Sequence, residues 1–296
     1  MIPERGDDHT RYEILPFPKA IEQARALDHP AHLTVTCSPK HGPDQAVDIA
    51  ARLRELGHEV TVHIAARMVR DSEHVEALLR RMTELGITDM FLIGGDVAEP
   101  VGEYASAGEL LRAVSADPLR PACIGIGGYP EGHPLIDDAT LDETLMSKAE
   151  LADYVTTQLC FDPAALTRWL ARQRGNGLNL PVWIGMPGQV SAAKLVEISA
   201  RIGVGPSISF LRKQRGLRGL LGMLTARHGT ATERLFDQLG PLIGADHRVV
   251  GLHYYTFNEL VATREWHRTH DLSVIRFAEA VPVQSKQSAP FGEAAS

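Results

Sequence analysis

Residues 89–100 read DMFLIGGDVAEP, and this stretch contains a pattern that recurs along the chain. Residues 89–93 form a short apolar run of the kind that predicts a buried strand. Two glycines and a carboxylate, Gly94, Gly95 and Asp96, follow where that strand ends. What this carboxylate does depends on the kind of sheet to which the strand belongs.

Seven further runs of β type alternate with helical patterns. The expected strands cover residues 12–15, 32–36, 59–64, 89–93, 122–126, 154–157, 182–184 and 249–255. Apolar residues at helical spacing predict helices over 44–56, 72–85, 107–114, 141–151, 163–172, 191–200 and 231–239. Eight alternating units in a chain of 296 residues predict an α/β fold, a single-domain (β/α)8 TIM barrel over residues 1–280.

An open, doubly wound sheet is the alternative to the barrel. Such a sheet would favour a glycine-rich nucleotide fingerprint after a strand. Gly125, Gly127 and Gly128 follow the fifth expected strand, but the next residues, YPEGHP, do not begin a helix. Residues 281–296 contain mainly small and polar residues, so we expect a poorly ordered carboxyl-terminal tail there.

The composition restricts the partners and the compartment. Apolar residues make up 44% and charged residues 23%, which is typical of a globular protein in water, and the net charge of −7 gives no general attraction to nucleic acid or anionic membranes. No apolar run approaches the roughly 18 residues of a membrane span, and the amino terminus lacks the apolar core of a signal peptide. Cys37, Cys123 and Cys160 have no metal-type spacing. We expect a cytoplasmic protein without a metal. Whether the chain forms a homo-oligomer does not follow from the composition.

In a barrel of this type, chemistry takes place at the carboxyl ends of the strands. Glu13 lies in the first expected strand, and alternation places Glu13 and Leu15 on the face that lines the barrel interior. A carboxyl group in an apolar barrel mouth loses solvation when it ionises, so its pKa rises, which suits a general acid near neutral pH. The alternative is that Glu13 faces solvent or pairs with an arginine.

Three more polar residues stand at or near expected strand ends, and each has two interpretations. The glycines before Asp96 would let a flat cofactor approach the backbone, where a fixed negative charge would tune its electron affinity; the alternative is a helix N-cap or an Asx-turn. His63 is a candidate ligand-contacting residue or a hydrogen-bonded core histidine. Gln158 is a candidate binding residue or a cap of the following helix.

Several motifs agree in order and spacing with one known family. The chain resembles the methylenetetrahydrofolate reductase family between residues 11 and 260, through the segments YEILP (12–16), GD (95–96), GYPEGHP (128–134), TQLCFD (157–162) and HYYTFN (253–258). The resemblance implies a flavin-bearing barrel in which NAD(P)H reduces FAD and FAD reduces 5,10-methylenetetrahydrofolate to 5-methyltetrahydrofolate, a reaction that can also run in reverse.

The resemblance also implies roles for individual residues. Glu13 matches the proton donor that helps to open the five-membered ring of the folate. Asp96 matches the carboxylate beside flavin and pterin, and Gln158 matches the residue that contacts the pterin. The matches to FAD contacts are Thr36, His63, Asp96, Tyr129, His133 and, with one gap allowed, Lys148.

The chain departs from the family pattern at three places. The first motif is usually EFFPP and here reads EILPF, the arginine that often precedes the GD pair is Gly94, and residues 145–148 read LMSK in place of a basic run. Two alternatives therefore stay open. One is a flavin-independent reductase in which NADH passes its hydride directly to the folate one-carbon unit. The other is a catalytically silent barrel that binds folate or a partner protein.

A basic segment, residues 210–218, reads FLRKQRGLR in a chain that is acidic overall. Our hypothesis is that Arg212 and Lys213 receive the anionic glutamate tail of the folate or a cofactor phosphate. The alternative is a solvated helix face.

Overall fold

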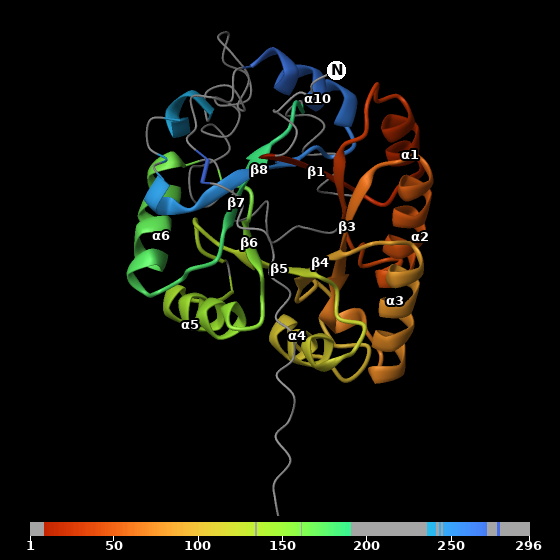
Figure 1. The fold of residues 1–296 in the computed structure, drawn as a ribbon. Helices are drawn as coiled ribbons and strands as arrows, with labels where there is room; N and C mark the ends of the chain where they lie inside the picture. The colour runs from red at the N-terminus through yellow and green to blue at the C-terminus, as the bar shows by residue number, and fades with distance from the viewer. Residues whose placement is uncertain are drawn as a thin grey trace, which may run out of the picture.

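The computed structural model describes residues 9–133, 135–160, 162–190, 236–240, 243, 245–270 and 277–278. Eight parallel strands form a closed barrel in chain order, and β8 pairs with β1 to close it (Figure 1). The strands are β1 Thr10–Ile14, β2 His32–Val35, β3 Glu59–Ala65, β4 Asp89–Ile93, β5 Cys123–Gly128, β6 Tyr154–Thr157, β7 Val182–Pro187 and β8 Val249–Tyr255. The predicted (β/α)8 barrel is confirmed, and the open sheet is excluded.

Helices surround the barrel on its outside (Figure 1). They are α1 Pro18–Arg25, α2 Gly42–Glu55, α3 Ser72–Glu84, α4 Ala107–Ala116, α5 Asp138–Ala149, α6 Pro163–Gly175 and α10 Leu260–Thr269, with short 3-10 turns η2 Ala66–Met68 and η4 Ala245–His247. No described helix combines the length and the apolar composition that crossing a bilayer requires.

The sequence did not predict α1 and α10. Helix α1 has eight residues, and its buried face consists of Ala20, Ile21 and Ala24, so its apolar signal is short and weak. Helix α10 buries polar residues, among them Arg264 and His267, which interrupt the apolar period. The helix predicted over 191–200 lies outside the described residues. Of the one predicted over 231–239, residues 236–239 are described and are helical.

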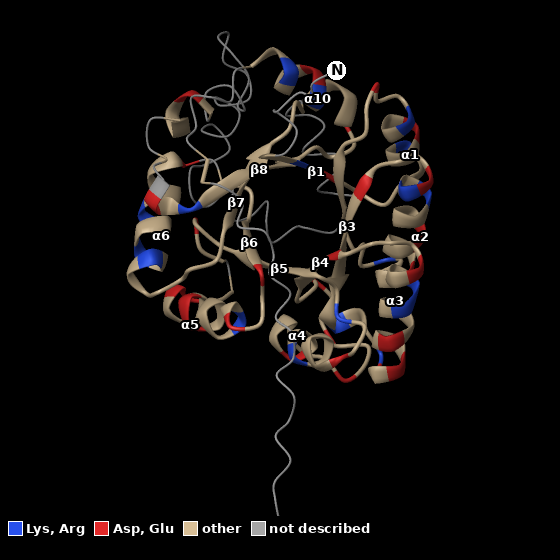
Figure 2. Cartoon of the chain, in the orientation of Figure 1, with Lys and Arg blue, Asp and Glu red and all other residues tan. Residues whose placement is uncertain are grey.

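The charged residues gather on the outer helices and loops, while the strands carry few of them (Figure 2). Outward-facing strand residues such as Ile14, Leu33 and Leu92 pack with the helices in one continuous apolar core. Inside the barrel, Phe91, Tyr154, Trp183 and Val250 form a second, smaller cluster. The interior is therefore a packed core.

One end of the barrel is covered by residues that are distant in sequence. The backbone N–H of Ala278 donates to the carbonyl of Val249 at 2.7 Å, and the ring of Phe277 stacks on that of His9 at 4.8 Å. Val249 begins β8 and His9 precedes β1, so these residues cover the amino-terminal end of the barrel. The carboxyl ends of the strands form the opposite end.

Gly251 makes room for a large residue in the barrel interior. A Cβ atom at this position would lie 2.2 Å from Cζ3 of Trp183 and 2.5 Å from the backbone oxygen of His9. We expect Gly251→Ala to lower the free energy of unfolding by about 1–3 kcal/mol, the usual cost of overpacking a core. Gly175→Ala is the matched control, because nothing lies within 4 Å of its added Cβ. Urea unfolding measures both, and equal midpoints for the two variants would contradict the packing described here.

Candidate active site

The inner and outer faces of β1 carry different residue types. Tyr12 and Ile14 face outward and belong to the main apolar core. Arg11 and Glu13 face inward: Arg11 reaches Asp89 of β4 across the barrel, and Glu13 contacts His253 of β8. The alternation expected from the sequence therefore holds for Glu13.

The Glu13 carboxyl group lies between two histidines. Its Oε2 is 3.2 Å from Nε2 of His253 and 4.0 Å from Nε2 of His63, and 13% of the side chain is exposed. Burial raises the pKa of Glu13 to about 7, although the charge of His63 acts in the opposite direction. Neither alternative interpretation holds, because Glu13 is not solvent-facing and its ionisable neighbours are histidines.

The two histidines bind protons weakly. Burial lowers the pKa of His63 to about 4, with His253 and Arg11 adding to the effect and Glu13 opposing it. Burial, together with the charge of Arg11, lowers the pKa of His253 to about 3. Both imidazoles are therefore neutral at physiological pH, and Glu13 is the member of this group that titrates near neutrality.

The end of β8 fixes the backbone on either side of Glu13. The carbonyl oxygen of Glu13 accepts hydrogen bonds from the Thr256 hydroxyl at 2.5 Å and the Thr256 backbone N–H at 3.2 Å. The Asn258 amide accepts from the backbone N–H of Leu15 at 2.8 Å and donates to its carbonyl at 3.1 Å. Phe257 and Asn258 adopt φ angles of 48° and 61°, so the chain makes a left-handed turn here.

Tyr255 connects His253, the neighbour of Glu13, to the end of β6. Its ring lies 5.0 Å from that of His253, and its hydroxyl donates to the carbonyl of Thr157 at 3.0 Å. A Cβ atom at Gly185 would lie 2.8 Å from Cε2 of Tyr255 and 2.9 Å from the backbone oxygen of Gln158. The glycine therefore allows the tyrosine ring to lie close to the strand end that carries Gln158.

Asp96, Tyr129 and His133 come together at the rim of the barrel. Asp96 is exposed in the loop after β4. The ring of Tyr129 meets that of His133 edge-on at 5.4 Å. Burial, and then the charge of Asp96, raise the pKa of Tyr129, and the same charge opposes the effect of burial on the pKa of His133. The interpretation of Asp96 as a helix N-cap is wrong, because Ser106 caps α4.

Arg67, in η2, holds the loop that carries Asp96. Its guanidinium donates to the carbonyls of Val97 at 2.9 Å, Ala105 at 3.1 Å and Ala98. Its backbone N–H also donates to the carbonyl of Gly94 at 3.0 Å. One side chain thus joins both ends of the β4–α4 loop. No local sequence pattern indicates this role, because all these partners are distant from Arg67 along the chain.

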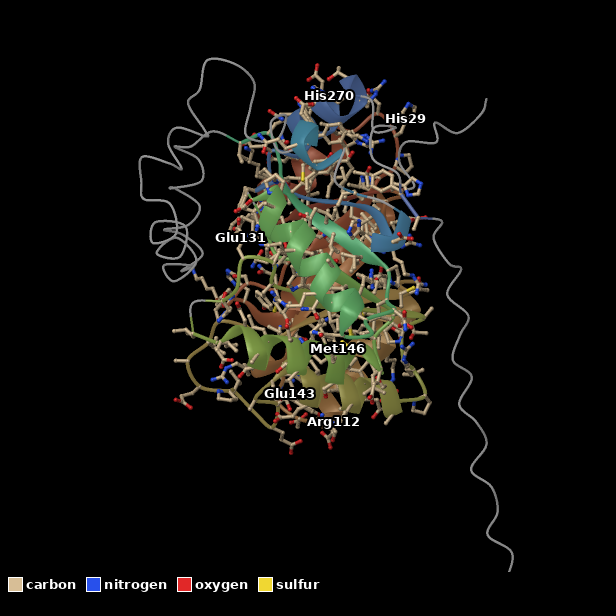
Figure 3. All side chains as sticks on the ribbon, turned by 90° about the vertical axis from the view of Figure 1, so that its left-hand side faces the viewer. His29, Arg112, Glu131, Glu143, Met146 and His270 are labelled. Carbon is tan, nitrogen blue, oxygen red and sulfur yellow. The ribbon has the colours of Figure 1, made fainter. Side chains whose placement is uncertain are left out.

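Gln158 lies exposed just past the end of β6, and its Oε1 accepts from the backbone N–H of Leu159 at 2.8 Å. The interpretation of Gln158 as a helix cap is wrong, because Asp162 caps α6. The backbone N–H of Asp162 donates to Oε1 of Glu131 at 2.9 Å, which joins the loops after β5 and β6. Figure 3 shows Glu131 at the left-hand end of the barrel, close to the beginning of α6.

The remaining predicted site residues divide into three cases. Thr36 is half-buried after β2 and donates its backbone N–H to the carbonyl of Ile14 at 3.1 Å, so it lies beside the end of β1. Lys148 lies in the last turn of α5, outside the strand ring, where burial lowers its pKa and its Cγ lies 3.9 Å from the Cβ position of Gly108. Arg212 and Lys213 lie outside the described residues.

Sequence reasoning missed several inward-facing residues. Arg11 and Asp89 form an ion pair at 2.9 Å, and the Tyr154 hydroxyl donates to Asp89 at 2.7 Å. His253 and Tyr255 stood in the HYYTFN segment but were not selected as site residues. Their spacing by two residues on a strand was the available signal, because it places both side chains on one face. The described residues contain no cluster of metal-ligating side chains.

The barrel therefore belongs to the class of parallel (β/α)8 proteins with a titrating acid inside the mouth at the carboxyl ends of the strands, as barrel enzymes have. A family profile for methylenetetrahydrofolate reductase matches residues 14–269. The chain belongs to the methylenetetrahydrofolate reductase family.

Two methylenetetrahydrofolate reductases of Schizosaccharomyces pombe share limited sequence identity with this chain. Methylenetetrahydrofolate reductase 1 of Schizosaccharomyces pombe is 30% identical over 125 residues, which cover 39% of this chain and 20% of that protein. Methylenetetrahydrofolate reductase 2 of the same organism is 24% identical over 230 residues, which cover 70% of this chain and 35% of that protein. The matches thus span about a third of these relatives or less.

A solved structure of oxaloacetate acetylhydrolase in complex with oxalate has a TM-score of 0.47 at 12% identity, covering 80% of this chain and 91% of that chain. No functional argument follows from similarity at this level.

The raised pKa of Glu13 makes the stability of the protein depend on pH in a defined direction. Because the pKa in the fold, about 7, exceeds the ordinary value of 4.5, the contribution of Glu13 to stability is fully present below pH 4.5 and is lost as the pH rises through 7. Glu13→Gln removes this loss. We expect the variant to exceed the wild type in free energy of unfolding by on the order of 3 kcal/mol near pH 8 and to match it at pH 4 and below.

Urea unfolding across this pH range measures the difference, and effects of other titrating groups cancel between the two proteins. Glu22→Gln is the control, because Glu22 is exposed on α1. A constant difference between Glu13→Gln and wild type at all pH values would show that Glu13 titrates normally.

Proposed function

We propose that this chain reduces 5,10-methylenetetrahydrofolate to 5-methyltetrahydrofolate with a hydride that originates from NAD(P)H, and that Glu13 is the acid of the reaction. The observation that carries the proposal is the position of Glu13 in the barrel mouth, where it holds a proton near neutral pH between two neutral histidines. Membership of the methylenetetrahydrofolate reductase family supplies the substrate class.

Glu13 performs the proton transfer in this proposal. Its protonated carboxyl donates to the folate ring nitrogen that leaves as the five-membered ring opens, and a cationic iminium remains on the substrate. His253 contacts the carboxyl oxygen and receives or returns the hydrogen bond as Glu13 loses and regains its proton. In the reverse direction Glu13 takes the proton back.

Asp96 and Gln158 would orient and stabilise the substrate at the rim. The negative charge of Asp96 favours the iminium because it is placed before the reaction begins. Gln158 is exposed just past the end of β6, close to the ring of Tyr255. There its amide can form hydrogen bonds with the polar edge of a pterin. Arg67 keeps the Asp96 loop in place through its three carbonyl contacts.

FAD, when bound, supplies the hydride to the substrate. The described residues fit its flat ring: nothing lies within 4 Å of the Cβ position of Gly94, and the atom nearest to that of Gly127 is the hydroxyl oxygen of Tyr129, at 3.8 Å. The imidazole Nε2 of His63 and the hydroxyl of Thr34 are buried without a hydrogen-bond partner among the described residues. Thr36, Tyr129 and His133 would border the ring, and Lys148 would approach the phosphates.

A second candidate function is direct hydride transfer from NADH without a flavin. The observation that favours it is that residues 145–148 read LMSK in place of a basic run, so Lys148 is the one cation that this segment offers to the FAD phosphates. The absorption spectrum of the purified protein separates the two candidates. Flavin bands, with FAD released on heating, support the first, and their absence after reconstitution with FAD supports the second.

A catalytically silent barrel that only binds folate or a partner protein is the third possibility. The burial of Glu13 opposes it, because a carboxyl group with a pKa near 7 costs stability without a binding role to require it. An anaerobic assay of NAD(P)H oxidation with methylenetetrahydrofolate separates an active reductase from a silent barrel. Turnover no higher than background would support the silent barrel.

Glu13→Gln tests the role of the acid. We expect methylenetetrahydrofolate reduction to fall by roughly 10²- to 10⁴-fold, the usual contribution of general acid catalysis, because Gln cannot donate a carboxyl proton. Transfer of electrons from NAD(P)H to menadione should be retained, since that reaction needs no proton donor to the folate. Glu22→Gln should leave both rates unchanged. Retained folate reduction in Glu13→Gln would remove Glu13 from the mechanism.

A further inference from the structure

Three basic side chains form a row across neighbouring strands, one layer below Glu13. Arg11 of β1 is in register with His253 of β8, and Tyr12 is in register with Leu33 of β2, so Arg11 is level with His32. Neighbouring strands lie about 5 Å apart, so an arginine stands between two histidines on the inner face of the barrel.

The position of the arginine charge is fixed. The Arg11 guanidinium is 2.9 Å from Oδ2 of Asp89 and lies 4.4 Å from the ring centre of Tyr154 and 4.2 Å from that of Trp183. A guanidinium does not lose its proton in proteins, so this charge is present at every pH at which the protein is folded.

Glu13 and His253 compete for one proton. Their side chains are 3.2 Å apart, and the pair exists either as a neutral carboxyl with a neutral imidazole or as a carboxylate with an imidazolium. Only the first form can donate a proton to a substrate from Glu13. In most proteins the ordinary pKa values, about 4.3 for Glu and about 6.5 for His, would favour the second form.

We propose that Arg11 is the positioning residue for this proton: its fixed charge, in register with His253, disfavours an imidazolium at that site and so keeps the proton on Glu13. The inference deepens the proposed function and rests on the role of Glu13 as an acid. It assigns a purpose to an ion pair inside a barrel core, where an apolar pair of similar volume would pack as well or better.

The surrounding groups agree with this direction. Arg11 is among the causes that lower the pKa of His253, of His63 and of His32. The pKa of Glu13 itself is raised by burial and is lowered by His63 when that imidazole is protonated. The charged and titratable groups that face this region from the packed strands are Arg11 and Glu13 of β1, His32 of β2, His63 of β3, Asp89 of β4, Cys123 of β5, Tyr154 of β6, and His253 and Tyr255 of β8.

The test replaces the ion pair and measures where the proton resides. The variant Arg11→Met with Asp89→Leu removes both charges and keeps the volume. NMR titration of the His253 imidazole, assigned with His253→Gln, reports its charge in the folded protein without any need for turnover. We expect the pKa of His253 to rise by about one unit, the lower end of the range for a single nearby charge, because the loss of the Asp89 charge offsets part of the effect.

Asp89→Asn is the matched control, because it disturbs the same contacts and leaves the Arg11 charge. The pKa of His253 should not rise in this variant. If the double variant does not fold, Arg11→Gln with Asp89→Asn also removes both charges, with smaller changes of shape, and provides the same measurement. No rise on loss of Arg11, or an equal rise in Asp89→Asn, would overturn the inference.

The pH dependence of folate reduction gives a second readout. In the double variant the protonated Glu13 form should be scarce at neutral pH, so kcat should fall at least about tenfold there, as each unit of pKa shift implies. A shifted His253 in a protein that reduces no folate even as wild type would refute the proposed function and leave the electrostatic role of Arg11 standing.

Discussion

The contact between Glu13 and His253, at 3.2 Å inside a closed barrel, is the interaction on which the candidate site depends. In water a glutamate beside a histidine would form an ion pair. Inside this barrel both ionised forms lose solvation, and the proton stays on the carboxyl group. Glu13 therefore still carries its proton near neutral pH and can donate it.

Closure of the barrel between β1 and β8 creates this contact. Without that pairing, Glu13 would lie on an edge strand and would face water. The closure is fixed by pairing in register along the two strands and by the bonds from Thr256 and Asn258 to the backbone of Glu13 and Leu15. The HYYTFN segment thus contributes His253 and Tyr255 to the interior and holds the acid in place at the same time. Arg67 holds the loop that carries Asp96 in a similar way, through hydrogen bonds to its backbone carbonyls.

Local patterns in the sequence predicted the barrel and the inward direction of Glu13, because strand alternation and the βα period are properties of neighbouring residues. The helices α1 and α10 were missed because one is short and the other buries polar residues. The roles of Arg11, Asp89 and Arg67 depend on partners in other strands or loops, and no local pattern contains that information. The motif segments identified the family, but the positions of Lys148 and Gln158 beside their neighbours required the structure.

The protonation state of Glu13 can be measured directly by infrared difference spectroscopy of the wild type against Glu13→Gln, across the pH range in which the protein is folded. If Glu13 is the proton donor, its protonated carboxyl band disappears with a midpoint near pH 7. A midpoint near the ordinary value of 4.5 would contradict it, since Glu13 would then be ionised under the conditions in which it is assigned to donate a proton.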